Sequence, residues 1–412
     1  MPKSLDELYS DAQAAIFDAD AASVRRLLKS MQKQAPDDPL TIEVAGDLAC
    51  LQDDFDEGIE QFLRLEAMLD NPRAQGMGKL SRAMVIESQG DHITAYDLYA
   101  EASGLLEAAQ EWLNWGTAMG RLGSLQQEFG ELSEATETFQ ELLNRLDDLD
   151  DEDEYGHLLA LANYSYGVLL RQIGELDHAE AVLREALRMY IEIEDVQQAA
   201  VCLDALGVIE QVRGNYDEAE KLHLESLEIH TDLEWNSGLS LNYGNLTMLN
   251  LNRGDLDQAE QYARKAYAID QADGNRNGEA HFHLLLGQIE SERKNFDEAE
   301  QSFQRAVALY EEVGDAEDMA SVYSQIGVLY RLTNRLDEAE EYLQKASQLA
   351  EEMDHADGMA AVTHEHGLLR AAQGRRDEAV ELFRQAIERY RALEAEARIE
   401  EIERDLAALE SA

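Results

Sequence analysis

Pairs of histidines are the first candidates for chemistry in this sequence. His281 and His283 lie two residues apart, and so do His364 and His366. Side chains two apart on a helix point to roughly opposite sides, whereas a helical zinc site needs histidines at i and i+4 on one face. We therefore expect no metal centre at either pair.

An acidic run at residues 147–154 raises the possibility of calcium binding. An EF-hand loop requires alternating oxygen ligands, a glycine at its sixth position and a glutamate at its twelfth, and this spacing is absent. The run instead predicts a solvated loop at residues 147–156, where a basic segment of a partner could still dock.

Enzyme motifs are absent from the sequence, which has no nucleophile elbow, phosphate-binding glycine loop or zinc-protease helix. Among 86 aspartates and glutamates, a pair of carboxylates at a useful distance is expected by chance. Cys50 and Cys202 are the only cysteines, and we expect two buried thiols without a disulfide. The sequence thus predicts a protein that is not an enzyme and holds no cofactor or metal.

A segment that returns every forty residues organises the chain. Residues 174–180 return at 214–220 and at 254–260. A fixed period of this length is typical of stacked supersecondary units, which present an extended surface instead of one central core. Further copies begin at Asp53, Gly90, Gly130, Lys294, Asn334 and Gly374, with a faint one around Asp18, which gives nine hairpins and a doubtful first one.

The pattern inside one unit predicts two helices joined by a turn. In residues 200–227, Leu203 and Leu206 belong to an apolar face at helical spacing. Gly214 can adopt the left-handed conformation that often ends a helix. Asp217 then falls in the first turn of the second helix, where the helix dipole favours a carboxylate.

Three positions keep one residue type in most units: a small residue seven before the turn, an alanine five after it, and a large apolar residue nine after it. This pattern resembles the tetratricopeptide repeat in its forty-residue form, similar to the repeats of kinesin light chains and the Pins/LGN group. The resemblance implies an all-α, right-handed superhelical solenoid of about nine helix–turn–helix repeats with a C-terminal capping helix. The small residues are Gly123, Gly167, Gly207, Gly287, Gly327 and Gly367, and the large ones include Phe62, Tyr99, Phe139, Leu183, Phe303, Leu343 and Phe383.

Two units depart from this pattern. Thr247 replaces the small residue, and His223 and Ala263 replace the large one, so we expect looser packing there. His366 aligns with apolar residues such as Leu206 in other units, which predicts a histidine in the core.

The repeat spacing also divides the chain. We expect irregular hairpins at residues 1–146, the acidic loop at 147–156, a regular array at 157–394 and a capping helix at 395–412. The last helix has one apolar stripe, and a dimerising helix is the alternative. Its stripe consists of Ile399, Ile402, Leu406 and Leu409.

Charge is unevenly divided between the two helices of a unit. Residues 237–252 have no formal charge, and residues 157–173 have only Arg171. In the tetratricopeptide repeat family, first helices line the concave groove, and asparagines there can hold the backbone of an extended peptide. Carried over by position, the resemblance predicts a groove lined by Tyr164, Val168, Arg171, Asp204, Val208, Asn245, Met248, Asn252, His281, Gln288, Ser324, Val328, Arg331 and His364.

The function implied is that of a non-catalytic scaffold or adaptor, which binds a peptide or protein segment in this groove. One alternative is a ligand-responsive regulator that resembles the repeat domains of bacterial peptide-responsive phosphatases and transcription activators. Another is a scaffold that self-assembles through its terminal repeats.

Net charge is −52, which makes nucleic acid or an anionic membrane an improbable partner. No apolar run is long enough to insert in a membrane and the first residues do not resemble a secretory signal, so we expect a cytoplasmic protein. The acid either attracts a basic partner or keeps the protein hydrated in a saline habitat. Its spread through nearly every repeat, and only eight lysines against 26 arginines, favour hydration.

Carboxylates at this density repel one another, so the fold is expected to loosen at low ionic strength. The thermal unfolding midpoint should rise steadily from low to molar sodium chloride. A midpoint that stays flat over this range would contradict the expectation.

Overall fold

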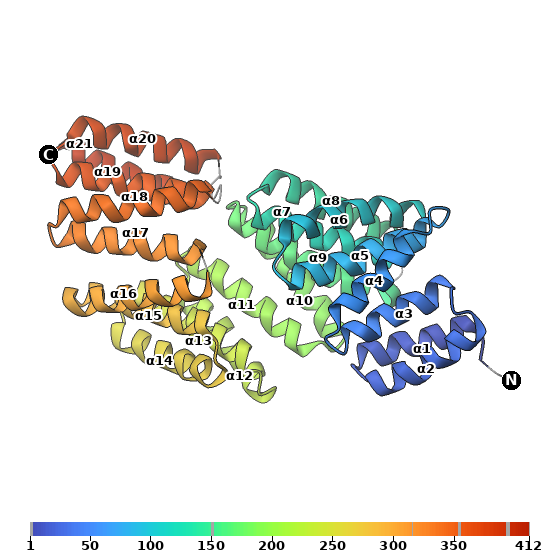
Figure 1. Cartoon of the computed structure of the whole chain (residues 1–412). Coiled ribbons are helices and arrows are strands. Elements are labelled where there is room, and N and C mark those ends of the chain that lie inside the picture. Colours follow the sequence, from blue (N-terminus) through green and yellow to red (C-terminus); the bar gives the residue numbers. More distant parts are fainter. Residues whose placement is uncertain (1–2, 150–151, 315, 353–355, 393–395, 412) are drawn as a thin grey trace. The chain divides into compact units, whose positions relative to one another are not determined.

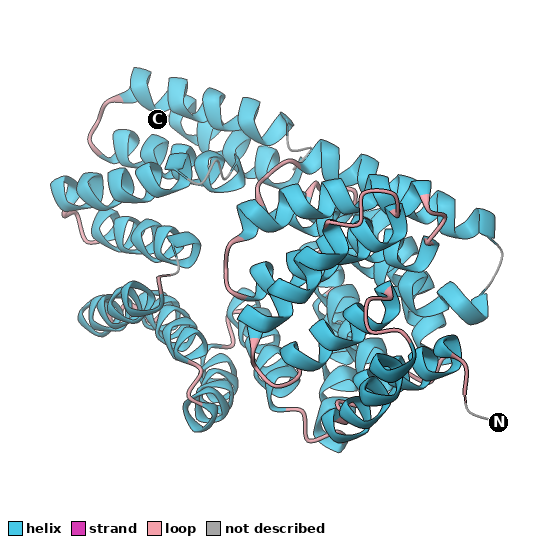
Figure 2. Cartoon of the chain, turned by 45° about the vertical axis from the view of Figure 1, so that its right-hand side comes forward, coloured by secondary structure: helices cyan, strands magenta, loops and turns pink. Residues whose placement is uncertain are grey.

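A computed structural model describes residues 3–149, 152–314, 316–352, 356–392 and 396–411. These residues form twenty-one α-helices and no strand, which confirms the all-α prediction (Figures 1 and 2). No helix in the described ranges is both long and apolar enough to cross a membrane. The chain divides into two compact units, Met1–Ser165 and Tyr166–Ala412, which are described separately.

Unit 1 is a stack of antiparallel helix pairs in which each helix from α1 to α7 packs on the next. Its core begins in the first pair, where Leu8, Val24 and Met31 are buried against Val44. The faint copy around Asp18 is therefore a true hairpin. The helices are α1 (Leu5–Phe17), α2 (Ala21–Gln34), α3 (Pro39–Cys50), α4 (Phe55–Glu66), α5 (Pro72–Ser88), α6 (His92–Ala108), α7 (Trp112–Glu128), α8 (Leu132–Leu149) and the first part of α9 (Glu152–Gln172).

Unit 2 continues with the same hairpin, so that α1 to α20 form ten pairs in the described chain. Odd-numbered helices are the first helices of their pairs and even-numbered helices are the second. The helices of unit 2 after α9 are α10 (Leu176–Glu192), α11 (Val196–Val212), α12 (Tyr216–Asp232), α13 (Asn236–Arg253), α14 (Leu256–Asp273), α15 (Arg276–Glu292), α16 (Phe296–Val313), α17 (Ala316–Leu332), α18 (Leu336–Glu352), α19 (Ala356–Ala372), α20 (Arg376–Ala392) and α21 (Glu396–Ser411).

The acidic segment differs from the predicted loop. Helix α8 continues to Leu149 and α9 starts at Glu152, so 147–149 and 152–156 are helical. Residues 150–151 lie outside the described ranges.

The turn inside each hairpin requires a left-handed residue. Gly214 has φ +80°, a conformation that glycine adopts without steric cost. Lys294, at the same position in a degenerate copy, has φ +63°. The turn geometry is thus kept where the glycine is lost, because the flanking helices fix it.

Most hairpins are closed by a small residue on the first helix that faces a large one on the second. A Cβ added to Gly287 would lie 2.4 Å from the ring of Phe303, and one added to Gly367 would lie 2.6 Å from Phe383. The large side chain thus occupies the space that any other residue on the first helix would need. The same contact joins Gly46 to Phe62, Gly123 to Phe139, Gly167 to Leu183, Gly207 to His223 and Gly327 to Leu343.

One hairpin exchanges the two sizes. In α13 and α14, Thr247 stands at the small position and Ala263 at the large one, and both are fully buried. The exchange keeps the helices packed at Thr247 but removes the bulk of a phenylalanine or leucine from the second helix.

Three consecutive junctions of unit 2 are joined by an arginine at the end of the first helix. Arg213 donates to Glu180 at 2.5 Å and Asp177 at 2.6 Å, both on the preceding second helix. Arg253 binds Glu220 and Asp217 in the same way, and Arg293 binds Glu260 and Asp257. Hydrogen bonds from Arg213 and Arg184 lower the pKa of Glu180, and burial opposes them.

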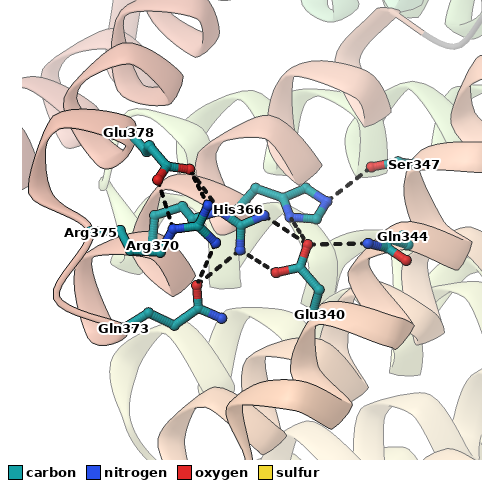
Figure 3. Close-up of polar contacts among 8 residues, drawn as sticks. All are labelled: Glu340, Gln344, Ser347, His366, Arg370, Gln373, Arg375 and Glu378. Carbon is teal, nitrogen blue, oxygen red and sulfur yellow. Dashed lines mark hydrogen bonds and ion pairs between the residues drawn. The ribbon is translucent and has the colours of Figure 1, made fainter.

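At the next two junctions, the glutamate of the second helix is again bound by an arginine, but this arginine comes from a different position in the following hairpin. Arg335 binds Glu300 at 2.8 Å, and Arg370 forms a two-pronged ion pair with Glu340 (Figure 3). His366 lies beside this pair and contacts Ser347 through Nε2 at 3.2 Å. Only 15% of its side chain is exposed, so His366 is largely buried, as its alignment with core positions predicts, although its described partners here are polar.

Helix α21 covers the exposed end of the last hairpin. Ile399 and Ile402 are buried, and Leu406 and Leu409 pack with them against Phe383 of α20 and its apolar neighbours. Arg398, Glu400, Glu403 and Arg404 are exposed on its other sides.

The contact between Gly287 and Phe303 makes a testable prediction. Gly287→Ala should lower the urea midpoint of unfolding, by the equivalent of about 1–3 kcal/mol, because the new methyl group collides with the ring. Gly244→Ala is the control, since nothing lies within 4 Å of its Cβ position, and it should be neutral or stabilising. The pair Gly287→Thr with Phe303→Ala, which copies Thr247 and Ala263, should be less destabilised than Gly287→Thr alone. Equal midpoints for Gly287→Ala and Gly244→Ala would contradict this account.

Candidate functional site

The first helices of unit 2 form its inner face. Neighbouring first helices, such as α13 and α15, contact one another across the repeats. Neighbouring second helices in the described ranges do not share a comparable contact. The stack therefore curves toward its first helices, which places any groove of unit 2 along them.

A pocket of about 590 Å³ lies on this face between α13 and α15. Its volume is typical of small-ligand and peptide side-chain sites. Helix α14 supplies Ala263 and Ala266, and α17 supplies Asp318 at one edge. The lining consists of Ser237, Ser240, Leu241, Gly244, Asn245, Met248, Ala263, Ala266, Asp270, Asn275, Asn277, Gly278, His281, Phe282, Leu285 and Asp318.

The size exchange in α13 and α14 explains why space is left here. Ala263 stands where other hairpins have a phenylalanine or leucine that fills the interior. Its short side chain forms part of the pocket wall together with Ala266 and Met248. The departure from the repeat pattern is thus the local cause of the cavity.

Asp270 is a buried carboxylate in the pocket wall, with 5% of its surface exposed. It accepts hydrogen bonds from the Ser240 hydroxyl at 2.7 Å and from the Asn275 amide at 2.9 Å. A Cβ on Gly278 would lie 2.2 Å from its carboxyl carbon, so Gly278 makes room for it. Its described partners are neutral, and no ion pair joins it to a described arginine or lysine.

His281 lines the pocket and interacts electrostatically with both of its acidic residues. Desolvation by the surrounding walls lowers the pKa of its imidazole, while Asp318 and Asp270 partly oppose this shift. The histidine is therefore mostly neutral at neutral pH. None of the described residues that line the pocket is a lysine or arginine, so the pocket has net negative charge.

Polar groups without a described partner also face the pocket. The Asn245 amide and the His281 imidazole form no hydrogen bond with another described residue, and both line the cavity. Leu241, Met248 and Leu285 give it an apolar surface. The arrangement suits a ligand with hydrogen-bonding groups and an apolar stem.

Three predicted groove residues, Asn245, Met248 and His281, come together in this pocket. Others lie on first helices outside it, with partly or fully exposed side chains. These are Tyr164 in unit 1, and Val168, Arg171, Val208, Asn252, Gln288, Ser324, Val328 and Arg331 in unit 2. Arg331 is bound to Glu365 of α19 at 3.2 Å.

Asp204 does not line a groove, contrary to the prediction. It is 3% exposed and accepts hydrogen bonds from His223 at 2.8 Å, Ser226 at 2.9 Å and Asn242 at 2.6 Å. Asn242 in turn contacts His230 at 2.5 Å. His223 occupies the large position of its hairpin, so its polar ring required a buried acceptor, and Asp204 supplies it.

His364 was also placed in the groove by register, and the structure buries it. Its Nε2 lies 2.8 Å from Asp405 of the last helix, and its ring meets Phe383 edge-on at 5.6 Å. The prediction failed because register within one repeat does not show that α21 covers the final pair.

Sequence reasoning missed Asp270, Asp318, Ser240 and Asn275. Asp270 lies at the end of a second helix, a class of helix expected on the outer surface. A signal was present, because Ala263 and Thr247 marked this hairpin as irregular. Among the described residues, no group of three potential metal ligands is found.

Two family models, both described as tetratricopeptide repeat, match this sequence. One matches residues 198–272, 278–352 and 318–392, and the other matches 160–190, so that together they cover more than half of the chain. The chain belongs to the tetratricopeptide repeat family. No curated protein matches it in sequence.

Solved structures share the fold at low sequence identity, which establishes likeness of fold alone. A Rap protein complexed with competence and sporulation factor has a TM-score of 0.63 at 13% identity, over 85% of this chain and 98% of that one. The Rap conjugation gene regulator of plasmid pLS20, in complex with the Phr* peptide, has 0.55 at 15%, over 85% and 96%. The apo form of the quorum sensor NprR from B. thuringiensis has 0.59 at 16%, over 84% and 98%.

The burial of Asp204 predicts a structural role. Asp204→Ala should lower the urea midpoint by the equivalent of about 2–4 kcal/mol, because it leaves several buried polar groups without their acceptor. Ligand binding in the pocket should be unchanged at temperatures where the variant is folded. Asn252→Ala, which alters an exposed groove residue, is the control and should leave the midpoint unchanged. Equal midpoints for Asp204→Ala and Asn252→Ala would contradict a structural role for Asp204 and would favour its predicted place in the groove.

Proposed function

We propose that this protein is a non-catalytic adaptor that binds a peptide or an extended protein segment along the first helices of unit 2. The observation that carries the proposal is the pocket between α13 and α15. There, the polar groups of Asn245 and His281 have no hydrogen-bond partner among the described residues, so a ligand could bind to them. An asparagine amide can donate to a peptide carbonyl and accept from a peptide N–H at the same time.

The predicted groove residues outside the pocket extend this site in the proposal. Val208 on α11 and Ser324 on α17 lie on the first helices to either side of it. A segment that crosses successive first helices would place one side chain in the pocket and its backbone along the neighbouring helices.

The solved structures support this choice of ligand. Two of the similar folds are complexes, one with competence and sporulation factor and one with the Phr* peptide. We extend peptide binding to this chain because the fold provides the same kind of surface and the pocket offers unpaired polar groups.

A ligand-responsive regulator is the second candidate. The similar structures include one called a quorum sensor and one called a conjugation gene regulator, and this chain covers nearly their whole length. A regulator would change its conformation when peptide binds. Hydrogen exchange that slows only beside the pocket would favour the adaptor, and slowing across distant helices would favour the regulator.

The wider setting is also part of the proposal. A cytoplasmic location and a hydrating role for the acidic surface follow from the sequence pattern, and oligomers could form through the terminal repeats. The absence of enzyme motifs from the sequence supports a non-catalytic role.

Selection of displayed random peptides on the purified full chain tests the proposed function. It should be run in molar salt, which screens non-specific attraction to the acidic surface. Gly244→Phe should abolish enrichment, because this residue lines the pocket and nothing lies within 4 Å of its Cβ position. Gly104→Phe, at an equally open helical position in unit 1, is the matched control and should enrich peptides like the unmodified chain.

Failure to enrich any peptide on the unmodified chain would count against the proposal. So would equal enrichment on Gly244→Phe, because binding would then lie outside the pocket.

A further inference from the structure

We infer that the pocket between α13 and α15 takes a cationic side chain of the bound segment, a lysine or arginine whose charged end lies between Asp270 and Asp318. This inference rests on the proposed function and specifies the chemistry of its ligand.

Burial of the Asp270 carboxyl group favours a ligand that carries a positive charge. Burying a carboxylate without a counter-ion is costly, and neutral donors recover only part of the lost hydration. Asp270 is 95% buried, and its hydrogen bonds come from the Ser240 hydroxyl and the Asn275 amide. A ligand cation would supply the opposite charge that the described part of the chain does not place beside it.

This absence of an arginine contrasts with the junctions between the hairpins of unit 2. At five successive junctions, the carboxylate of the second helix is bound by an arginine of the next hairpin, as in the pairs of Glu220 with Arg253 and Glu260 with Arg293. In an acidic chain with 26 arginines, a buried carboxylate that faces an open cavity without one is an exception. The exception lies where a ligand can reach it.

The position of Asp318 also favours a cation in the pocket. It reaches the pocket from α17, one repeat beyond α15, and lines the same cavity as Asp270. The charges of both carboxylates act to raise the pKa of His281, so the three groups lie close to one another. Two acidic groups from different hairpins would bind a shared cation more strongly than either would alone.

The shape of the cavity distinguishes a side chain from a small inorganic cation. Leu241, Met248 and Ala266 give the cavity an apolar wall. Lysine and arginine place a charged group on an aliphatic stem, and the stem packs on such a wall while the charge meets the acid. A bare ion would leave the apolar wall in contact with water.

Small amides test the inference without knowledge of the partner. The full chain is labelled at its methionine methyl groups, and the Met248 signal reports on the pocket while Met189, buried elsewhere in unit 2, reports on global change. N-acetyl-arginine amide in molar salt should shift Met248 saturably and leave Met189 unchanged. The neutral analogue N-acetyl-citrulline amide should bind about tenfold more weakly or not at all, because it lacks the charge-assisted hydrogen bonds.

Three variants locate the effect. Asp270→Asn and Asp318→Asn should each weaken binding of the arginine amide by about tenfold. Asp232→Asn removes one negative charge at an exposed position of α12 outside the pocket, and it should bind like the unmodified chain. If Asp270→Asn disturbs the fold, the affinity of Asp318→Asn for the arginine amide still tests the inference.

The cation could come from a side chain or from the amino terminus of a peptide. Glycylglycine amide distinguishes these two sources, because it has a free amino terminus and no cationic side chain. Weak binding of this probe is expected because it cannot cover the apolar wall. Affinity equal to that of the arginine amide would overturn the assignment to a side chain.

Equal affinity for the arginine and citrulline amides, or unaltered binding in both Asp→Asn variants of the pocket, would overturn the inference. Selected peptides without a basic residue would also overturn it and leave the proposed function intact. Conversely, binding of the arginine amide with no peptide enriched would support a cation-binding pocket and reject peptide binding.

Discussion

The close approach of the two helices in each hairpin is the constraint on which this structure depends. Phe303 reaches so near to Gly287 that no β-carbon fits between them, and the same relation recurs along both units. A large side chain buried against bare backbone excludes water and fixes how the helices cross. Because every hairpin has the same shape, each can stack on the next with one geometry, and stability accumulates between neighbours. The repeat period in the sequence is a consequence of this packing.

Electrostatics then determine how such an acidic chain remains stacked. A single exposed ion pair contributes little to stability. Here, however, arginines such as Arg213 and Arg293 each bridge several carboxylates at a half-buried junction, where the planar guanidinium can bind two acids at once. Lysine would not provide this geometry, which agrees with its scarcity in the sequence. The junctions thus neutralise acid where repeats meet and leave it exposed on the outer helices.

The fold could be predicted because it follows from periodicity, whereas the site depends on departures from it. Hairpins, turns and the pairing of small with large residues all repeat, so their register was visible. That register also placed Asn245, Met248 and His281 on the inner face. The repeat register could not show that Asp204 is buried. Asp204 is buried because His223, at the large position of its hairpin, needs a hydrogen-bond acceptor. Nor could the register show Asp270 in the pocket, since a second helix was expected to face outward.

The two irregular hairpins are adjacent, and they resolve the same packing problem in opposite ways. In α11 and α12, the large position holds His223, and a buried polar network satisfies Nδ1 of its ring. In α13 and α14, the large position holds Ala263, and part of the space stays open as a pocket. An open space persists only if its walls do not collapse inward. Arg253 ties α13 to α12, and Arg293 ties α15 to α14, so each wall is anchored to the repeat before it. The pocket can therefore stay open without a ligand, so a bound segment would not have to separate the helices.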